Sequence, residues 1–355
     1  MDKETFEKQK AFAGEKKPSM LRRCVGHDYT GRQIYMITMV TEGRRPLFGE
    51  LCGRSDGETG TPEAPGIKLS ALGMRVEKEW WGIPYYYPQI EILAIQMMPD
   101  HFHGILFVKK KMEKDLSTVM RGFKTGCNRA YRELVLGLSP VQYVATESQQ
   151  TEQAKKRDDR QQGLLFARGF NDKLLLQEGQ LERWQQYLAD NPRRLLMKRE
   201  HPDLFRVQRG LTVAGYSFSA IGNRFLLDRP VLVQVQCSRG LTQAEIDRKT
   251  RECLTLARQG AVMVSPSISP GEKAVMGAVY KEGLPLIYLQ ENGLTDLAKP
   301  GGKRMEACSR GQLLILAPWE HHNERTTIKR GQCLSLNDMA KTICNYQFNN
   351  NIQPS

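Results

Sequence analysis

Two histidines, spaced two residues apart, form the first pattern in this sequence that suits chemistry. His101 and His103 belong to the run Pro99-Asp100-His101-Phe102-His103-Gly104, which begins a predicted strand. Side chains alternate between the two faces of a strand, so both imidazoles point to one face and Phe102 to the other. Two imidazoles so placed can share one divalent metal ion; they can equally be a partly exposed pair on a sheet.

A tyrosine and an asparagine on a predicted helix form the second pattern. Leu181, Trp184 and Leu188 make an apolar stripe, with Tyr187 at its edge. Asn191 follows four residues after Tyr187 and therefore lies on nearly the same face, one turn along. Tyr187 can be a phenolic nucleophile and Asn191 an oxygen ligand to a metal. The alternative is a tyrosine at the boundary of the core and an asparagine that ends the helix.

These segments resemble a known family over roughly residues 28–205. Met97–Leu106 is similar to the hydrophobic-Pro-[Asn/Asp/Glu]-His-x-His signature of the single-tyrosine HUH transposases, in particular their REP-associated tyrosine transposase branch. Arg44–Gly49 and Phe170–Pro192 also resemble that family. Its nucleophile stands four residues before an Asn in a Tyr-x-x-x-Asn-Pro segment, which is the spacing found here. Asp100 departs from the frequent Asn.

The resemblance implies a reaction on DNA. His101, His103 and Asn191 would hold Mg²⁺ or Mn²⁺, and the metal would polarise a scissile phosphate in single-stranded or hairpin DNA. Tyr187 would attack phosphorus and give a 5′-phosphotyrosine and a free 3′-OH. A phenol has a pKa of about 10, so the metal or a neighbouring base must help it to ionise. Tyr131 and Tyr143 lack the Asn-Pro context.

The same resemblance implies a ferredoxin-like fold and a homodimer. The histidines would lie on a central strand and the tyrosine on a helix. In such dimers a tyrosine acts either with its own histidines or with those of its partner, and the sequence leaves both arrangements open.

The second half of the chain carries polar turns after its predicted strands. Gln236–Thr242 follows the first strand, and Ser265–Gly271 follows the second and enters a helix. Backbone N–H groups at a helix start can cradle a phosphate, although such residues are also ordinary strand-to-helix turn chemistry. The sequence contains no G-x-G-x-x-G and no P-loop, which weakens a dinucleotide or ATP hypothesis.

The order of these features is remotely similar to the Rossmann-like domain of DNA-processing protein A, over about residues 206–345. The matching segments are Ser238-Arg239, Leu256–Gly260, Ser265–Gly271, Gly311–Pro318 and Lys329–Gly331. Gly271-Glu272 replaces the usual Gly-x-Asp. The resemblance implies a phosphate or single-stranded DNA surface, formed by Ser238, Arg239, Lys329 and Arg330.

The periodicity of apolar residues predicts the strands and helices that position His101, His103, Tyr187 and Asn191. The first half predicts strands at 33–40, 90–97 and 101–108, and helices at 67–81, 112–136 and 177–190. The last helix is expected to stop at Asn191-Pro192. The helix at 112–136 carries exposed basic residues suited to DNA binding, namely Arg121, Lys124 and Arg129. Ser139–Gln162 is a polar loop, longer than the family pattern suggests, and the half reads as α+β.

In the second half of the chain, predicted strands and helices alternate regularly. This half predicts strands at 231–236, 260–264, 286–289 and 312–317, and helices at 241–259, 269–282 and 334–343. Strands that alternate with helices indicate an α/β, Rossmann-like parallel sheet. The sequence therefore predicts a flexible leader at 1–25, an HUH transposase-like domain at 26–205 and a Rossmann-like domain at 206–355.

Charge and length restrict the partner and the compartment. The 355 residues include 52 Lys and Arg against 39 Asp and Glu, a net charge of +13, of which +6 falls in residues 1–205. This excess favours a polyanion such as nucleic acid, or else a basic surface with no special partner. No apolar run approaches the roughly 18 residues of a membrane span. The charged N-terminus has no signal-peptide core, and none of the eight cysteines forms a Cys-x-x-Cys pair, so we expect a cytoplasmic protein with reduced thiols.

Three functions stay open at this point. The first is a metal-dependent endonuclease and strand transferase for single-stranded DNA, similar to a transposase. The second is a hairpin-DNA-binding protein without catalysis. The third is a nucleotide-binding enzyme that acts through its C-terminal half.

Overall fold

The computed structural model describes residues 27–138, 165–167, 169–296, 298–322 and 327–352. The predicted leader at 1–25 and almost all of the predicted loop at 139–162 lie outside these ranges. The chain divides into two compact units, Met1–Leu196 (unit 1) and Met197–Ser355 (unit 2). It is a mixed α/β protein with several sheets. No helix among the described residues has the length and apolarity to span a bilayer.

A four-stranded sheet forms the centre of unit 1, in the order β4-β5-β1-β6. Its strands are β1 (Gln33–Val40), β4 (Ile90–Met98), β5 (His101–Val108) and β6 (Asn171–Leu175). Every neighbouring pair is antiparallel. The predicted strands at 33–40, 90–97 and 101–108 are confirmed. A separate two-stranded ribbon pairs β2 (Gly49–Cys52) with β3 (Gly66–Leu69).

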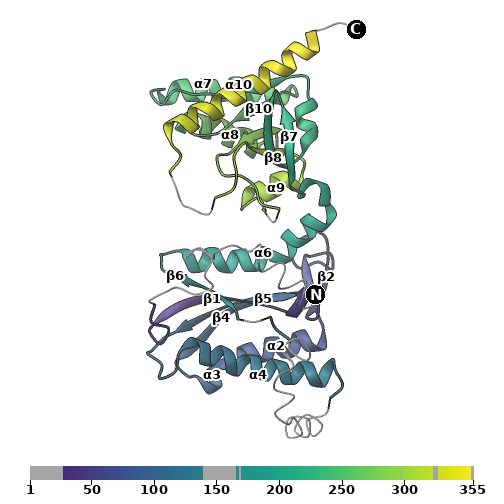
Figure 1. Ribbon diagram of the computed structural model, residues 1–355, viewed down its shortest axis with the longest axis vertical. Coiled ribbons are helices and arrows are strands. Elements are labelled where there is room, and N and C mark those ends of the chain that lie inside the picture. The colour runs from purple at the N-terminus through teal and green to yellow at the C-terminus, as the bar shows by residue number, and fades with distance from the viewer. Residues whose placement is uncertain (1–26, 139–164, 168, 297, 323–326, 353–355) are drawn as a thin grey trace, which may run out of the picture. The chain divides into compact units, whose positions relative to one another are not determined.

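Helices cover both faces of this sheet (Figure 1). One face carries α2 (Ala71–Trp81), α3 (Ile83–Tyr86) and α4 (Leu116–Leu134), and the other carries α6 (Gln180–Glu200). A short 3₁₀ helix spans Glu42–Arg44. Ser70 and Asp115 cap α2 and α4 by accepting hydrogen bonds from backbone N–H groups in the first turn. The predicted start at residue 67 was therefore wrong, because 66–69 pairs as β3 before the cap.

Two hydrophobic clusters lie on opposite sides of the unit 1 sheet. Phe102 and Leu106 of β5 point to the α2 and α4 side, where they pack with Trp80. Ile105 points to the other side, where it packs with Leu188 of α6. This alternation places His101 and His103 on the α6 side as well, because they share the parity of Ile105.

Helix α6 continues through Pro192, so the predicted stop at Asn191-Pro192 was wrong. Proline lacks the N–H that would bond to the carbonyl of Leu188, and this weakens the helix locally. Buried Leu188 lies before the proline, and buried Leu196 and Met197 lie after it. Packing on both sides therefore outweighs the local loss, and Asn191 lies inside the helix rather than at its end.

A mixed six-stranded sheet forms unit 2, in the order β7-β8-β12-β11-β10-β9. The strands are β7 (Gln208–Val213), β8 (Tyr216–Gly222), β9 (Leu232–Gln234), β10 (Val262–Ser265), β11 (Leu286–Leu289) and β12 (Leu313–Ala317). Strands β9 to β12 are parallel, whereas the β7–β8 hairpin adds to β12 in antiparallel fashion. The sheet is therefore mixed and not purely parallel as the sequence predicted.

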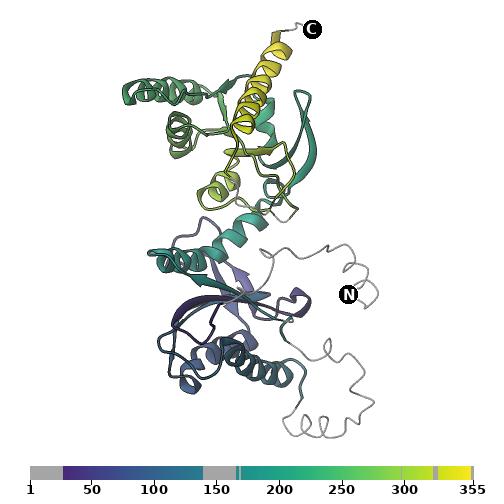
Figure 2. The same cartoon turned by 60° about the vertical axis from the view of Figure 1, so that its left-hand side comes forward.

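Two layers of helices enclose this sheet (Figure 2). The helices are α7 (Gln243–Arg258), α8 (Pro270–Lys281), α9 (Lys303–Ser309) and α10 (Arg330–Ile352), with 3₁₀ helices at Pro202–Leu204 and Arg224–Asp228. Met263 of β10 packs in the cluster that contains α7, α8 and α9 side chains. Val262 and Val264 pack in the cluster that contains Leu336 of α10. Strands buried on both faces in this way explain the continuous apolar runs in the sequence.

Candidate functional site

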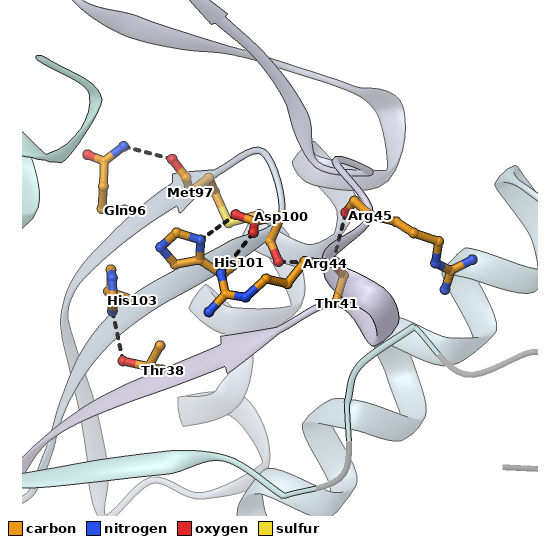
Figure 3. A network of polar contacts seen from close by, with 9 residues as sticks. All are labelled: Thr38, Thr41, Arg44, Arg45, Gln96, Met97, Asp100, His101 and His103. Atoms are coloured by element: carbon orange, nitrogen blue, oxygen red, sulfur yellow. Dashed lines mark hydrogen bonds and ion pairs between the residues drawn. The ribbon is translucent and has the colours of Figure 1, made fainter. Parts of the chain in front are cut away.

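The two histidines of β5 lie side by side on the face of the sheet that α6 covers. Their ring centroids are 4.9 Å apart, and the rings are nearly perpendicular. Figure 3 shows both rings on the same side of the strand. The strand geometry predicted from the His-x-His spacing is therefore confirmed.

A carboxylate orients the first histidine. Asp100 Oδ1 lies 2.6 Å from His101 Nδ1, and Asp100 Oδ2 lies 3.0 Å from Arg44 Nη1 (Figure 3). Burial alone would raise the pKa of Asp100, but the hydrogen bond and charge of His101, followed by those of Arg44, lower it to about 2. The carboxylate is therefore ionised and accepts from Nδ1–H, so in the neutral imidazole Nε2 is the nitrogen that carries the lone pair.

A threonine orients the second histidine. Thr38 of β1 pairs with His103 across the sheet, and its Oγ1 lies 2.7 Å from His103 Nδ1. A hydroxyl can donate or accept, so the contact holds the ring in either tautomer. On the other flank, Gln96 of β4 is the register partner of His103. One row of the sheet thus presents a hydroxyl, an imidazole and an amide toward α6.

Helix α6 brings Tyr187 over this row. The ring centroid of Tyr187 lies 6.4 Å from that of His103 and 5.2 Å from that of Trp184. The Tyr187 side chain remains 36% exposed. Arg194, two turns further along, places its guanidinium carbon 5.4 Å from the Tyr187 ring centre. The phenol therefore has an aromatic support on one side and a cation, a group that binds phosphate well, close by.

Asn191 is buried on the same helix, with 8% of its surface exposed. Its Nδ2 atom makes no hydrogen bond to any described residue. A buried unsatisfied amide is costly, which makes it a mark of a site that takes a ligand. The oxygen and nitrogen of an Asn side chain are assigned from hydrogen bonds, so a flipped amide would present Oδ1 in that place.

No group of three or more His, Cys, Asp or Glu side chains in the described part of the chain is arranged to hold a metal. Any metal at this site must therefore combine the two imidazoles with a different donor. Asn191 supplies an amide oxygen and suits a mixed nitrogen and oxygen ligand set.

The other predicted residues of unit 1 lie elsewhere. Arg121 and Arg129 are exposed on α4, which covers the face of the sheet away from α6 (Figure 1). Lys124 donates hydrogen bonds to the carbonyls of Ala167 and Gly169, at 3.1 and 2.7 Å. Tyr131 is buried and accepts from Arg45, at 2.7 Å. Tyr143 lies outside the described residues.

In unit 2, the predicted phosphate cradle at Ser265–Gly271 already has an acceptor. Glu272 is 2% exposed, and its carboxylate accepts from the backbone N–H groups of Ile268, Ser269 and Cys237. These N–H groups are therefore not available to a phosphate. Four other predicted residues are exposed, namely Ser238, Arg239, Lys329 and Arg330.

Sequence reasoning missed the contacts of three residues around the site. Thr38 and Gln96 carry no local signal, because only the pairing of β1, β4 and β5 places them beside His103. Arg194 does have a local signal, because it stands seven residues after Tyr187, two turns along the same helical face.

No family model matches this sequence. A curated but uncharacterised protein of Haemophilus influenzae is 26% identical over 91 residues, which are 26% of this chain and 44% of that protein. The chain thus matches less than half the length of this relative.

Three solved structures are similar to parts of the chain. DNA processing protein A of Helicobacter pylori, described for its single-stranded DNA binding mode, matches 39% of this chain and 66% of its own, with 19% identity and a TM-score of 0.32. The REP-associated tyrosine transposase bound to a REP hairpin matches 48% and 72%, with 14% identity and a TM-score of 0.30. A candidate transposase of Deinococcus radiodurans matches 48% and 97%, with 13% identity and a TM-score of 0.26.

Proposed function

We propose that the chain is a metal-dependent endonuclease and strand transferase for single-stranded or hairpin DNA, with Tyr187 as nucleophile. The observation that supports this best is the position of the Tyr187 ring, 6.4 Å from that of His103. Tyr187 lies on a helix that also carries a buried asparagine, and His103 lies on a strand that also carries His101. A tyrosine in the core boundary alone would not require polar groups on both sides.

The finer description of the fold belongs to the same proposal. The first unit is a ferredoxin-like domain. Its sheet has the strand order β4-β5-β1-β6. Along the chain, helices follow β1 and β5, which are the first and third strands of this sheet, as in the ferredoxin-like fold. The second unit is Rossmann-like, because four parallel strands alternate with helices. The functional domains are residues 26–205 and 206–355.

The residues fit a divalent metal such as Mg²⁺ or Mn²⁺. His101 and His103 would hold it through Nε2, because each Nδ1 contacts Asp100 or Thr38. Asn191 would supply Oδ1 after a flip of its amide, which would place this oxygen where Nδ2 now lacks a hydrogen-bond partner. When bound, the metal would withdraw charge from a phosphate oxygen.

The chemical step balances without any further reactant. The Tyr187 hydroxyl gives up its proton and forms a bond to phosphorus, while the bond from phosphorus to the 3′ oxygen breaks. The 3′ oxygen takes up a proton, and the 5′ phosphate remains on the tyrosine. The ester keeps its free energy, so the 3′-OH of a second DNA end can reverse the step and join the strands. Arg194 would hold the phosphate next to the phenol.

The proposal also covers the oligomeric state, the compartment and the role of unit 2. We expect a cytoplasmic homodimer, in which Tyr187 works with its own or its partner's histidines. Unit 2 would hold DNA through its exposed residues Ser238, Arg239, Lys329 and Arg330.

A covalent adduct tests the proposed function. The full chain is mixed with Mn²⁺ and a labelled single-stranded hairpin, and the products are separated on a denaturing gel. We expect a slow band that EDTA abolishes, that Tyr187→Phe reduces to background and that His101→Ala weakens by at least about tenfold. Tyr346→Phe, a matched change at another exposed tyrosine, should keep the wild-type yield.

Measuring hairpin binding separately from adduct formation distinguishes catalysis from binding alone and from a nucleotide-binding function. Tyr187→Phe should bind the hairpin as tightly as the wild type. If no hairpin gives an adduct with either metal while binding is retained, the chain is a hairpin-binding protein without catalysis. If only nucleotides raise the melting temperature, the function resides in unit 2.

A further inference from the structure

Three large aromatic side chains stand exposed on one side of unit 1, away from the candidate site. Trp81 is 51% exposed at the end of α2, and Tyr85 and Tyr86 are 84% and 74% exposed on α3. Side chains of this size usually bury most of their surface. We call these three residues the aromatic patch.

The backbone that carries the aromatic patch is fixed to the core of unit 1, so the exposed rings do not belong to a loosely packed segment. Ile83, which lies between Trp81 and Tyr85 in the sequence, is 4% exposed and packs in the core. Tyr87 packs against the same core, and a Cβ at Gly122 of α4 would lie 3.8 Å from its hydroxyl. The rings of Tyr85 and Tyr86 contact each other edge to face at 5.1 Å. A rigid support thus holds aromatic rings in solvent.

Positive charge borders the patch. Lys109, Lys110 and Lys111 are exposed at the end of β5, and the backbone N–H of Lys109 donates to Gln89, three residues after Tyr86. Arg121 is exposed beside Gly122 on α4. Lys78, one turn before Trp81, adds another exposed cation. This arrangement gives charge complementarity to a polyanion.

Several acidic groups lie near these cations. Glu91 lies 3.9 Å from Lys109, and Glu79 pairs with Arg75 at 3.1 Å. Glu77 is half-buried on α2, and Glu113 is exposed after the lysine run. Asp28 is exposed and interacts electrostatically with Lys111. The cations around the patch still outnumber these carboxylates, so its border keeps a small net positive charge.

We propose that the aromatic patch and its lysine border bind single-stranded nucleic acid. Unpaired bases stack on exposed aromatic rings, and the lysines follow the phosphates. Exposed tyrosines and cations combined in this way fit a strand with open bases better than a duplex, whose bases are stacked on each other. Helix α4, which the sequence marked for DNA binding, contributes through Arg121.

This surface goes beyond the proposed function, because it shares no residue with the Tyr187 site. His101 stands at the start of β5 and the lysines follow its end, so the two lie roughly 23 Å apart along the strand. A strand bound at the patch would be held in unit 1 whether or not Tyr187 cleaves it.

Binding of a labelled dT15 oligonucleotide to the full chain tests the inference. Fluorescence anisotropy is measured in EDTA, so that metal-dependent cleavage does not contribute. Tyr85→Ala with Tyr86→Ala should weaken binding by about tenfold or more, because bases lose their stacking partners. Tyr85→Phe with Tyr86→Phe should keep the affinity. Changing the three lysines to Gln should reduce the slope of log affinity against log salt by about 2.

Two controls define specificity. Phe225→Ala removes another highly exposed aromatic side chain, in unit 2, and should leave dT15 binding unchanged. A duplex of the same length should bind the Ala variant within about twofold of the wild type, because its bases are not open to stacking. All these side chains are exposed, so the melting temperature should stay the same.

Other results overturn the inference. An unchanged affinity for dT15 in the Tyr85→Ala, Tyr86→Ala variant would overturn it. If this variant instead turns a dimer into a monomer while its affinity for dT15 stays the same, the patch binds a second copy of the chain. Equal losses for dT15 and duplex would remove the stacking role. These outcomes do not depend on the Tyr187 adduct: a missing adduct with weakened dT15 binding rejects the proposed function and keeps this surface.

Discussion

At the scale of single residues, the candidate chemistry depends on how the two imidazoles are held. His101 and His103 approach each other from one strand, yet different elements orient them. Asp100 in the β4–β5 turn contacts the first, and Thr38 on β1 contacts the second. A neighbour on Nδ1 fixes the ring so that Nε2 points toward the ligand. Of the two contacts, that of Asp100 is charged and therefore the stronger.

Asp100→Asn should impair metal use without unfolding the protein. Asn keeps an acceptor for His101 Nδ1 but loses the charge that Arg44 and His101 share. We expect Mn²⁺ affinity, measured by calorimetric titration, to fall about 10–100-fold, and the adduct yield to need correspondingly more Mn²⁺. Asp56→Asn, at an exposed aspartate paired with Arg54, should change neither. An unchanged Mn²⁺ affinity in Asp100→Asn would show that this carboxylate does not act through His101.

The sequence predicted the residues of the site whose signal is local. The period of two predicted the common face of His101 and His103, and the spacing of four predicted that Tyr187 and Asn191 share a helical face. Only the family resemblance linked this helix to the histidines. Thr38 was out of reach, because it meets His103 only through the register of β1 with β5, 65 residues apart. A single sequence does not encode strand register in any short pattern.

At the scale of elements, one buried carboxylate ties two turns of unit 2 together. Glu272 is the third residue of α8 and completes a capping box with Ser269. It also accepts from the N–H of Cys237, in the turn after β9. Helix α7 has the same capping box, with Glu245 and Thr242, but there the glutamate is exposed and serves its own helix alone. The two glutamates thus differ in burial and in reach.

Glu272→Ala should destabilise unit 2 far more than Glu245→Ala. The first change leaves three N–H groups without this acceptor, two of them in buried contacts and that of Ile268 in a half-buried one, at about 1–3 kcal/mol for each buried group. We expect a loss of about 3 kcal/mol or more, or roughly 6–12 °C in the unfolding temperature of this unit. The second change removes a cap contact that is exposed to solvent and should therefore cost far less. Equal shifts in the two variants, followed by circular dichroism, would contradict the tie between the turns.

The differences between predicted and observed elements come from non-local packing. The β7–β8 hairpin was not predicted, because its partner β12 lies almost 100 residues later. Strand β6 was missed because its five residues mix charged and apolar side chains on an edge of the sheet. Helix α6 passes Pro192 because Leu188 and Leu196 are buried on either side. In each case tertiary contacts outweigh the local pattern.

At the scale of the whole molecule, each unit has its own cores. Two hydrophobic clusters use only residues before 197, and two use only residues from 197 onward. The positive charge is also divided, since residues 1–205 carry +6 of the total of +13. Seven cysteines of the described residues are free thiols, so no disulfide among them joins the units. Stability should therefore reside in each unit separately.

Calorimetry of the full chain with one variant in each unit tests this separation. Gly104→Ala would place a Cβ 2.2 Å from the ring of buried Trp80, so β5 and α2 must move apart, at a cost of about 1–3 kcal/mol or more. Gly277→Ala on α8 meets no atom within 4 Å and serves as the matched glycine control, with a neutral or slightly stabilising effect. We expect two thermal transitions, because each unit exposes its own cores when it unfolds. Gly104→Ala should lower the midpoint of one transition and Glu272→Ala that of the other. If both variants shift a single shared transition by similar amounts, the chain unfolds as one cooperative body and the separation is wrong.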